Sequence, residues 1–388
     1  MADVAGPRAG RMAIRRGELC SAARAAPMTW STVAMAISLR KPPVRTVVGL
    51  DIEPGRIVAA EVSVNGSVRL ERAATIDLPV GAVRDGEVVD VAAVTDALKE
   101  LWQGQKGLRR DVRIGVANAK IVVRTLDLPP VNGRGELDMV VRQVVADELP
   151  MPMESAVIDY EAIGLVDTLA GTRQRVVVVA ARKEMVEAAI AAASGAGLRT
   201  RGVDLSAFAM IRILGGRRRT DSGLYLSIGG MANLAVVLEG VCTFTRVTGA
   251  GLEGMGIDLA DRASLTVAHA REWLRHVGFE RELAAIDGDP EIVANARAVL
   301  VQGTRRLASD IRASLEFHRT QTQAGAEIER AVLTGAAVAI PGFSGALSAE
   351  LGMPVEARSV VAGKGFSSDE ELAGLTVAAG LAIEVAPG

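Results

Sequence analysis

The chain has 388 residues, of which 49% are apolar and 23% charged, a composition typical of a globular protein with a sizeable core, and its length corresponds to roughly two to three domains. Lys and Arg total 44 against 46 Asp and Glu, so the net charge of −2 argues against nucleic acid as a partner, and an aromatic content of 3% leaves few side chains for stacking single-stranded bases. The two cysteines, Cys20 and Cys242, are too few for a disulfide framework or a zinc site, which agrees with a reducing cytosol.

Residues 1–44 are rich in Ala, Arg and Gly and show neither helical nor strand periodicity, so we predict a disordered basic extension. The stretch 29–39 resembles the apolar part of a signal peptide, but its Thr and Ser residues are too polar and Arg40-Lys41 follows directly. No segment reaches the roughly 18 to 20 apolar residues that cross a membrane. We therefore expect neither secretion nor a membrane span.

Residues 45–119 have the pattern of one part of an α/β lobe. Pro54-Gly55 and Asn65-Gly66 separate runs rich in Val and Ile, and Asn-Gly is a strong two-residue hairpin signal. Asp90 is placed to cap a helix with one apolar face. Three antiparallel strands, a helix and a returning strand are therefore expected, at residues 46–51, 57–64, 67–78, 91–102 and 112–117.

Residues 120–204 are expected to form an α+β subdomain inserted between the halves. Its elements are predicted in the order strand, helix, strand, strand, helix and strand, at residues 120–128, 137–149, 156–163, 173–180, 183–194 and 199–204. Residues 205–222 then return as a helix and linker. A module inserted in a larger domain tends to provide a partner-binding face.

Residues 223–388 repeat the opening pattern and are expected to form the second lobe. Three strands separated by Gly229-Gly230 and Glu239-Gly240 begin about 175 residues after the first set, which indicates an internal duplication. A helical insert is predicted at about 252–328, and a C-terminal helix at about 369–385.

The first hairpin carries part of the chemistry with which paired β-hairpins bind a nucleotide phosphate tail. The amides of a glycine turn form a concavity that binds anions, and a carboxylate at the strand end orients Mg²⁺. This turn keeps Asp51, the candidate metal ligand, and Gly55. It also contains Pro54, which lacks an N–H, and Glu53, whose charge repels phosphate.

The second hairpin carries the complementary part. It has Gly229, Gly230 and the polar Asn233, but Ser227 stands where a carboxylate is expected. The glycines of either turn alone are equally explained as ordinary hairpin glycines. Their occurrence in both halves of a duplication favours phosphate binding.

Two further glycine motifs accompany these turns. A buried strand runs into Gly335-Ala336, where small residues let a flat base approach the backbone. Residues 249–254 match the dinucleotide motif G-x-G-x-x-G, through Gly249 and Gly251. That motif also requires a following parallel strand that ends in an acidic residue, and helical sequence continues here instead, so we do not expect a dinucleotide fold.

Taken together, these motifs resemble the actin-like ATPase superfamily. The resemblance rests on four runs, VVGLDIEPGRIVAAEV (47–62), YLSIGGMANLAVVLEG (225–240), RVTGAG (246–251) and VLTGAAVAIPG (332–342). Three runs in the middle narrow it to the PilM family of type IV pilus assembly proteins, ELPMPMESAVIDYEAIG (148–164), VVVVAARKEMVEAAI (176–190) and GLRTRGVDLSAFAMIRIL (197–214). The resemblance extends from about Arg45 to the C-terminus.

This resemblance implies an actin-like, ribonuclease H-like duplicated two-lobe α/β fold, with the inserted α+β subdomain that the division protein FtsA shares. It also implies a cytoplasmic scaffold at the inner face of the membrane. Such proteins bind the cytoplasmic N-terminal tail of a PilN-like membrane protein in a groove beside the extra subdomain. They link the alignment complex to the pilus motor ATPase and platform components, and self-association into a homo-oligomer stays open.

The resemblance assigns the nucleotide site residue by residue. Asp51 matches the first-loop aspartate, whereas the following family run of glycine, serines and lysine is replaced from Glu53 onwards. The other matches are Gly229 and Asn233 in the second loop, Gly249 and Gly251 after the third strand, and Gly335 with Ala336 on the adenine side. Ser227 replaces the usual second aspartate, and hydrolysis needs charge stabilisation by Mg²⁺ and a group that positions water. We therefore expect ATP with Mg²⁺ to bind weakly or not at all, and no efficient ATPase.

Two other functions stay open at this point. An FtsA-like actin homologue in cell division or shape predicts a C-terminal amphipathic anchor, which the sequence after Glu384 does not provide. A sugar kinase of the same superfamily requires a catalytic aspartate, for which Asp51 is the one candidate base.

Overall fold

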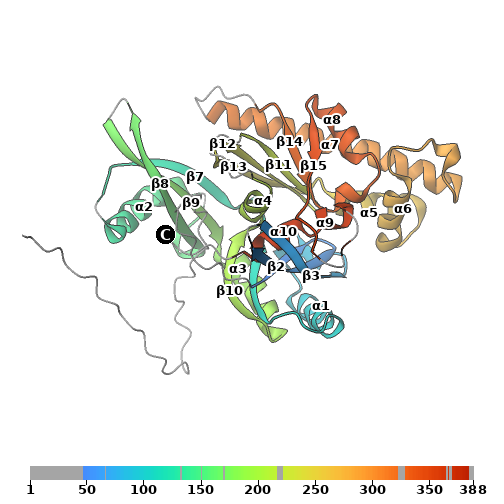
Figure 1. The fold of residues 1–388 in the computed structure, drawn as a ribbon, viewed down its shortest axis with the longest axis horizontal. Helices are drawn as coiled ribbons and strands as arrows, with labels where there is room; N and C mark the ends of the chain where they lie inside the picture. The colour runs from blue at the N-terminus through green and yellow to red at the C-terminus, as the bar shows by residue number, and fades with distance from the viewer. Residues whose placement is uncertain are drawn as a thin grey trace, which may run out of the picture.

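A computed structural model shows the architecture of the chain (Figure 1). It describes residues 47–65, 67–131, 133–149, 151–168, 171–215, 222–321, 328–363, 366 and 369–383. The predicted disordered extension, residues 1–44, lies outside this part of the chain, as does most of the linker expected before residue 222.

The first lobe is built on a five-stranded sheet with the order β10-β6-β1-β2-β3. Its strands are β1 (Val48–Glu53), β2 (Arg56–Asn65), β3 (Ser67–Asp77), β6 (Asp111–Val116) and β10 (Arg199–Leu205). Strand β1 pairs antiparallel with β2 and parallel with β6. A small hairpin, β4 (Val83–Arg84) and β5 (Glu87–Val88), precedes α1 (Val91–Gly104), and the Asp90 carboxylate caps α1 by accepting the amide of Ala93.

The second lobe repeats this plan in a sheet with the order β13-β12-β11-β14-β15. Its strands are β11 (Gly223–Ile228), β12 (Ala232–Leu238), β13 (Val241–Thr248), β14 (Ala331–Thr334) and β15 (Val355–Ala357). The antiparallel partner of β11 is β12 and its parallel partner is β14, the same arrangement that β1 has with β2 and β6. The duplication expected from the sequence is therefore confirmed.

Helices of the second lobe occupy the interval predicted to be a helical insert. They are α5 (Leu252–Ala263), α6 (Val267–Val277), η2 (Leu283–Ala285) and the long α7 (Pro290–Gln321). Two further short elements follow β14, η3 (Ala336–Ala339) and α8 (Phe343–Leu351). Leucines and valines of α5, α6 and α7 pack with β11, β12 and β14 in one hydrophobic core.

The inserted subdomain is smaller than the predicted interval 120–204. It consists of β7 (Val122–Leu128), α2 (Arg134–Glu148), η1 (Met153–Ser155), β8 (Ala156–Thr168) and β9 (Gly171–Arg182), with the sheet order β7-β9-β8. Val141 and Val178 are buried in a core of its own. The next two elements, α3 (Lys183–Gly195) and β10, belong instead to the first lobe, because β10 pairs parallel with β6 and α3 is buried against α1.

The end of the chain also differs from the prediction of one helix at about 369–385. Two short helices, α9 (Asp369–Ala373) and α10 (Thr376–Leu381), are separated by a turn, and residues 384–388 lie outside the described chain. Helix α10 returns to the first lobe, where it packs on β1 and on α4 (Ser206–Leu214); Figure 1 shows α10 beside α4. The contact is close, since a Cβ at Gly49 would lie 1.8 Å from the carbonyl oxygen of Ala378.

Within the described residues, none of the helices combines the length and the apolar character that crossing a membrane requires.

Candidate functional site

The two predicted phosphate turns meet at one place, which we call the hairpin junction (residues 53–56 and 228–231). Glu53, at the end of β1, reaches across it: its Oε2 accepts a hydrogen bond of 2.7 Å from the backbone N–H of Gly230. Its Oε1 accepts a hydrogen bond of 2.7 Å from Nε of Arg56. The carboxylate is 13% exposed, and it joins the first lobe to an amide of the second.

The glycines of the second turn are in direct contact with the first turn. A Cβ at Gly229 would lie 2.1 Å from Oε2 of Glu53, and a Cβ at Gly230 would lie 2.1 Å from the carbonyl oxygen of Pro54. Gly251 is equally constrained, because a Cβ there would lie 2.3 Å from the carbonyl oxygen of Gly230. A side chain at Gly230 would therefore clash with the backbone of the first turn and one at Gly251 with the backbone of the second, whereas one at Gly229 would displace the Glu53 carboxylate.

A guanidinium from the second lobe also reaches the first turn. Arg271, on α6, is paired with Glu253 of α5 and lies with its Nη1 3.5 Å from the carbonyl oxygen of Gly55. Gly55 has a φ of +83°, in the left-handed region that favours glycine, and a Cβ there would meet both Arg271 and Glu253. Arg271 belongs to no recognisable motif, and Glu253 is a variable position of the G-x-G-x-x-G match, so the sequence provided no signal for this pair.

Asp51, the predicted metal ligand, lies on β1 two residues before Glu53 of the junction. Its Oδ1 accepts a hydrogen bond of 3.1 Å from the hydroxyl of Ser206. Burial, and next the charge of Glu53, raise the pKa of the Asp51 carboxyl to about 7. The described residues contain no group of three His, Cys, Asp or Glu side chains that could hold a metal ion. Magnesium binding by Asp51 stays a prediction.

Two other predicted residues lie near the base side of the junction. Gly335 has a φ of +94°, and a Cβ there would lie 2.6 Å from the carbonyl oxygen of Ile228, so this glycine lets β14 approach β11. Ala336 lines a cleft of about 430 Å³ between the lobes, together with Gly55, Gly229 and Gly230. The charged residues that line this cleft are Arg56, Asp77, Glu253, Arg271, Arg275 and Glu371.

The cleft fits only one part of a nucleotide. Its apolar walls, which include Leu252, Leu274 and Ala339, suit a flat base. The phosphate half does not suit a triphosphate, because the Gly230 amide already donates to Glu53 and two carboxylates, Glu53 and Glu253, lie at the turn.

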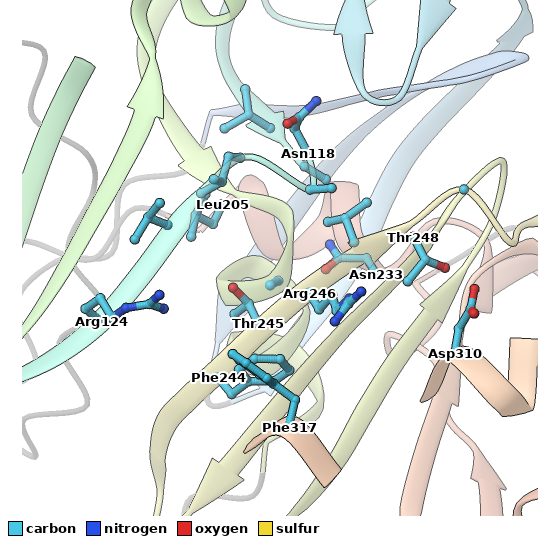
Figure 2. A pocket seen from close by; sticks show the side chains of 18 residues that line it. Asn118, Arg124, Leu205, Asn233, Phe244, Thr245, Arg246, Thr248, Asp310 and Phe317 are labelled. Atoms are coloured by element: carbon cyan, nitrogen blue, oxygen red, sulfur yellow. The ribbon is translucent and has the colours of Figure 1, made fainter. Parts of the chain in front are cut away.

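A second concavity lies between the subdomain and the second lobe, and we call it the edge-strand groove. It measures about 410 Å³ and is bordered by β7 and β13 (Figure 2). Each of these is the edge strand of its sheet among the described strands. The labelled side chains in Figure 2 are Asn118, Arg124, Leu205, Asn233, Phe244, Thr245, Arg246, Thr248, Asp310 and Phe317.

Two residues predicted for the nucleotide site lie in this groove instead. Asn233 is 7% exposed, and its Oδ1 is buried without a hydrogen-bond partner in the described structure. Gly249 lines the same groove. Ser227 pairs with Asn233 across β11 and β12. Within the β11–β12 hairpin, Asn233 on β12 lines the groove, whereas Gly229 and Gly230 in the turn lie at the junction.

The groove also has exposed aromatic and basic groups. Phe317, on α7, is 45% exposed, and its ring centroid lies 6.1 Å from that of Phe244 on β13. Arg124 and Arg246 are exposed on opposite walls, on β7 and β13. An apolar ring pair, two cations and an unsatisfied amide oxygen beside two edge strands are suited to an extended peptide.

The chain matches known proteins both in sequence family and in three-dimensional structure. The family model described as type IV pilus assembly protein PilM matches residues 49–385. The chain is similar to a solved structure described as the PilM-PilN type IV pilus biogenesis complex, with 27% identity and a TM-score of 0.71 over 88% of this chain and 98% of that chain. This likeness confirms the expected actin-like fold.

Two other structures are more distant. The ethanolamine utilization protein EutJ from Carboxydothermus hydrogenoformans is 17% identical, with a TM-score of 0.49 over 90% of this chain and 93% of that chain. MreB 5 of Spiroplasma citri bound to AMPPNP is 11% identical, with a TM-score of 0.48 over 87% of this chain and 95% of that chain.

Proposed function

Since the chain belongs to the PilM family of type IV pilus assembly proteins, we propose that it is a cytoplasmic scaffold that holds the N-terminal tail of a PilN-like inner-membrane protein in the edge-strand groove. The protein of the similar solved structure is described in complex with PilN. Held by this tail, the chain lies at the inner face of the membrane and connects the alignment complex to the pilus motor.

The observation that carries the proposal is the groove itself. It lies beside the inserted subdomain, between two strand edges whose outer backbone groups can pair with an added extended chain. The buried Oδ1 of Asn233 supplies an acceptor for a peptide N–H. The rings of Phe244 and Phe317 supply an apolar surface for a side chain.

The test is binding of a synthetic peptide with the sequence of the cytoplasmic tail of the PilN-like protein from the same genome, measured by fluorescence anisotropy. Phe317→Ala is expected to weaken binding about tenfold, because aromatic groups at the centre of an interface carry much of its energy. The matched control is Leu283→Ala, which removes an apolar side chain of similar exposure, 44%, on η2 outside the groove lining. Equal affinities for both variants would contradict the groove assignment.

Point variants are preferable to deletion of residues 120–204. That deletion would also remove α3 and β10, which are part of the first lobe, and would unfold the sheet that β10 shares with β6. Loss of binding would then carry no information on the groove.

For the nucleotide site, we propose that ATP with Mg²⁺ binds weakly or not at all and is not efficiently hydrolysed. The engaged Gly230 amide and the carboxylates at the junction support this. Isothermal titration calorimetry with Mg-ATP is expected to give no heat at micromolar protein concentration. A sub-micromolar affinity together with steady phosphate release would contradict it.

A further inference from the structure

The hairpin junction has the form of an anion site that already holds an anion. We propose that the Glu53 carboxylate is a built-in substitute for a nucleotide phosphate and fastens the two lobes together without a nucleotide. The inference concerns the junction alone and does not depend on the partner groove.

The contacts of Glu53 are those that a phosphate oxygen makes at a glycine turn. Oε2 accepts the Gly230 amide at 2.7 Å, and Oε1 accepts Nε of Arg56 at 2.7 Å. Hydrogen bonds to an ionised acceptor are about twice as strong as neutral ones, and burial strengthens them further. The Glu53 carboxylate thus accepts hydrogen bonds from both a backbone N–H and a guanidinium, and the backbone N–H belongs to the opposite lobe.

The close contacts of Gly229 and Gly230 also support this proposal. The Gly229-Gly230 pair is typical of a phosphate loop, yet both glycines here lie against the first hairpin. A Cβ at Gly229 would overlap Glu53, and a Cβ at Gly230 would overlap the carbonyl of Pro54. Pro54 itself has no N–H to offer a phosphate. Glu53, whose charge opposes phosphate binding at the first loop, therefore also forms the bond between the loops.

Further contacts surround this bond on the other side of the turn. Arg271 of the second lobe lies near the Gly55 carbonyl while paired with Glu253, and Arg56 lies 3.4 Å from the carbonyl of Gly374. Two guanidiniums, of Arg56 and Arg271, are thus paired with the carboxylates of Glu53 and Glu253 beside the turn. A polyphosphate entering there would add several negative charges and would have to displace Glu53 from Gly230.

The experiment compares wild type with Glu53→Ala and Glu53→Gln by peptide-resolved hydrogen–deuterium exchange over residues 226–234. Glu53→Ala is expected to speed exchange of the turn about tenfold or more, because the Gly230 amide loses a charge-assisted bond. Glu53→Gln keeps a neutral acceptor of the same shape and is expected to give a smaller increase. Millimolar formate or inorganic phosphate is expected to restore slow exchange in Glu53→Ala and to leave wild type unchanged.

The matched control is Glu87→Ala, which removes a partly buried carboxylate of the first lobe whose partners, Asn118, Lys120 and Arg182, lie outside the junction. It is expected to leave the exchange of residues 226–234 at the wild-type rate. The proposal is overturned if Glu53→Ala exchanges like wild type, or if its faster exchange is unaffected by either anion. It is also overturned if Glu87→Ala shows the same acceleration, since the effect would then be general loosening. None of these readouts uses the partner peptide.

Discussion

Asp204 and Arg212 form a buried ion pair where three elements of the first lobe meet, and neutralising one partner should destabilise that lobe strongly. Asp204, at the end of β10, is 1% exposed, and its Oδ2 accepts a 2.6 Å bond from Nη2 of Arg212 on α4. Its Oδ1 accepts the backbone N–H of Leu205 at 2.8 Å. Nη1 of Arg212 donates to the carbonyl of Gly380 on α10 at 2.7 Å. The pair therefore ties β10, α4 and α10 together.

Asp204→Asn preserves the shape and the acceptor for Leu205 but leaves the guanidinium of Arg212 without its counter-ion. Removing one partner of a buried pair costs about 3 to 5 kcal/mol, because the remaining charge stays desolvated. Since the amide oxygen still accepts one bond, we expect a loss near the lower end, about 3 kcal/mol. The double variant Asp204→Asn/Arg212→Met removes both charges and is expected to recover at least half of that loss.

The assay is urea unfolding followed by the fluorescence of Trp102, which is buried on α1 in the first lobe, in a background where Trp30 and Trp273 are replaced by Phe. A control variant, Asp96→Asn, breaks an exposed pair with Lys99 on the same helix and should cost less than about 0.5 kcal/mol. A loss below about 1 kcal/mol for Asp204→Asn, or no recovery in the double variant, would show that the pair does not stabilise the lobe by charge.

Three further outcomes follow from close contacts and burial. Gly49→Ala places a Cβ 1.8 Å from the Ala378 carbonyl oxygen, and the displaced α10 is expected to cost about 3 kcal/mol, seen as a lower Tm of the first lobe. Burial raises the pKa of the Asp159 carboxyl to about 6, so its ionisation opposes folding and stability falls as pH rises from about 4 to 6. Asp159→Asn is expected to raise the free energy of unfolding, measured with urea at pH 7.5, by about 1 to 2 kcal/mol and to have little effect at pH 4. Burial also raises the pKa of the Cys242 thiol to about 12, so in a Cys20→Ser background Ellman's reagent is expected to react with it only after denaturation.

Much of the fold was predictable because its signals are local. Alternating Val and Ile runs, the Asp90 cap and the Gly turns determine where strands and helices begin and end. The turn at Glu239-Gly240, for example, has positive φ at both residues, 52° and 78°, as a two-residue hairpin requires. The duplication was predictable as well, because the same local pattern occurs twice in the chain and similar local patterns fold into similar sheets.

Which distant segments of the chain lie side by side was not predictable, because the periodicity of a strand does not specify the strand with which it pairs. The run 199–204 reads as a strand in any sheet, and only its parallel pairing with β6 assigns it to the first lobe. Helix α10 belongs to that lobe for the same reason, through packing on β1 across more than half of the chain.

The candidate site was likewise predictable only in part. The amino-acid sequence by itself determined that each half of the molecule has a glycine-containing hairpin turn, that the first turn carries carboxylates and the second does not, and that the first turn is poor in phosphate donors. Only the tertiary structure decided what Glu53 does: its charge, which repels a phosphate, is held by the Gly230 amide 177 residues away. Likewise, the pleat of β12 directs Asn233 into the edge-strand groove. A side chain's type sets which bonds it can make, but the fold alone sets which groups lie within 3 Å of it.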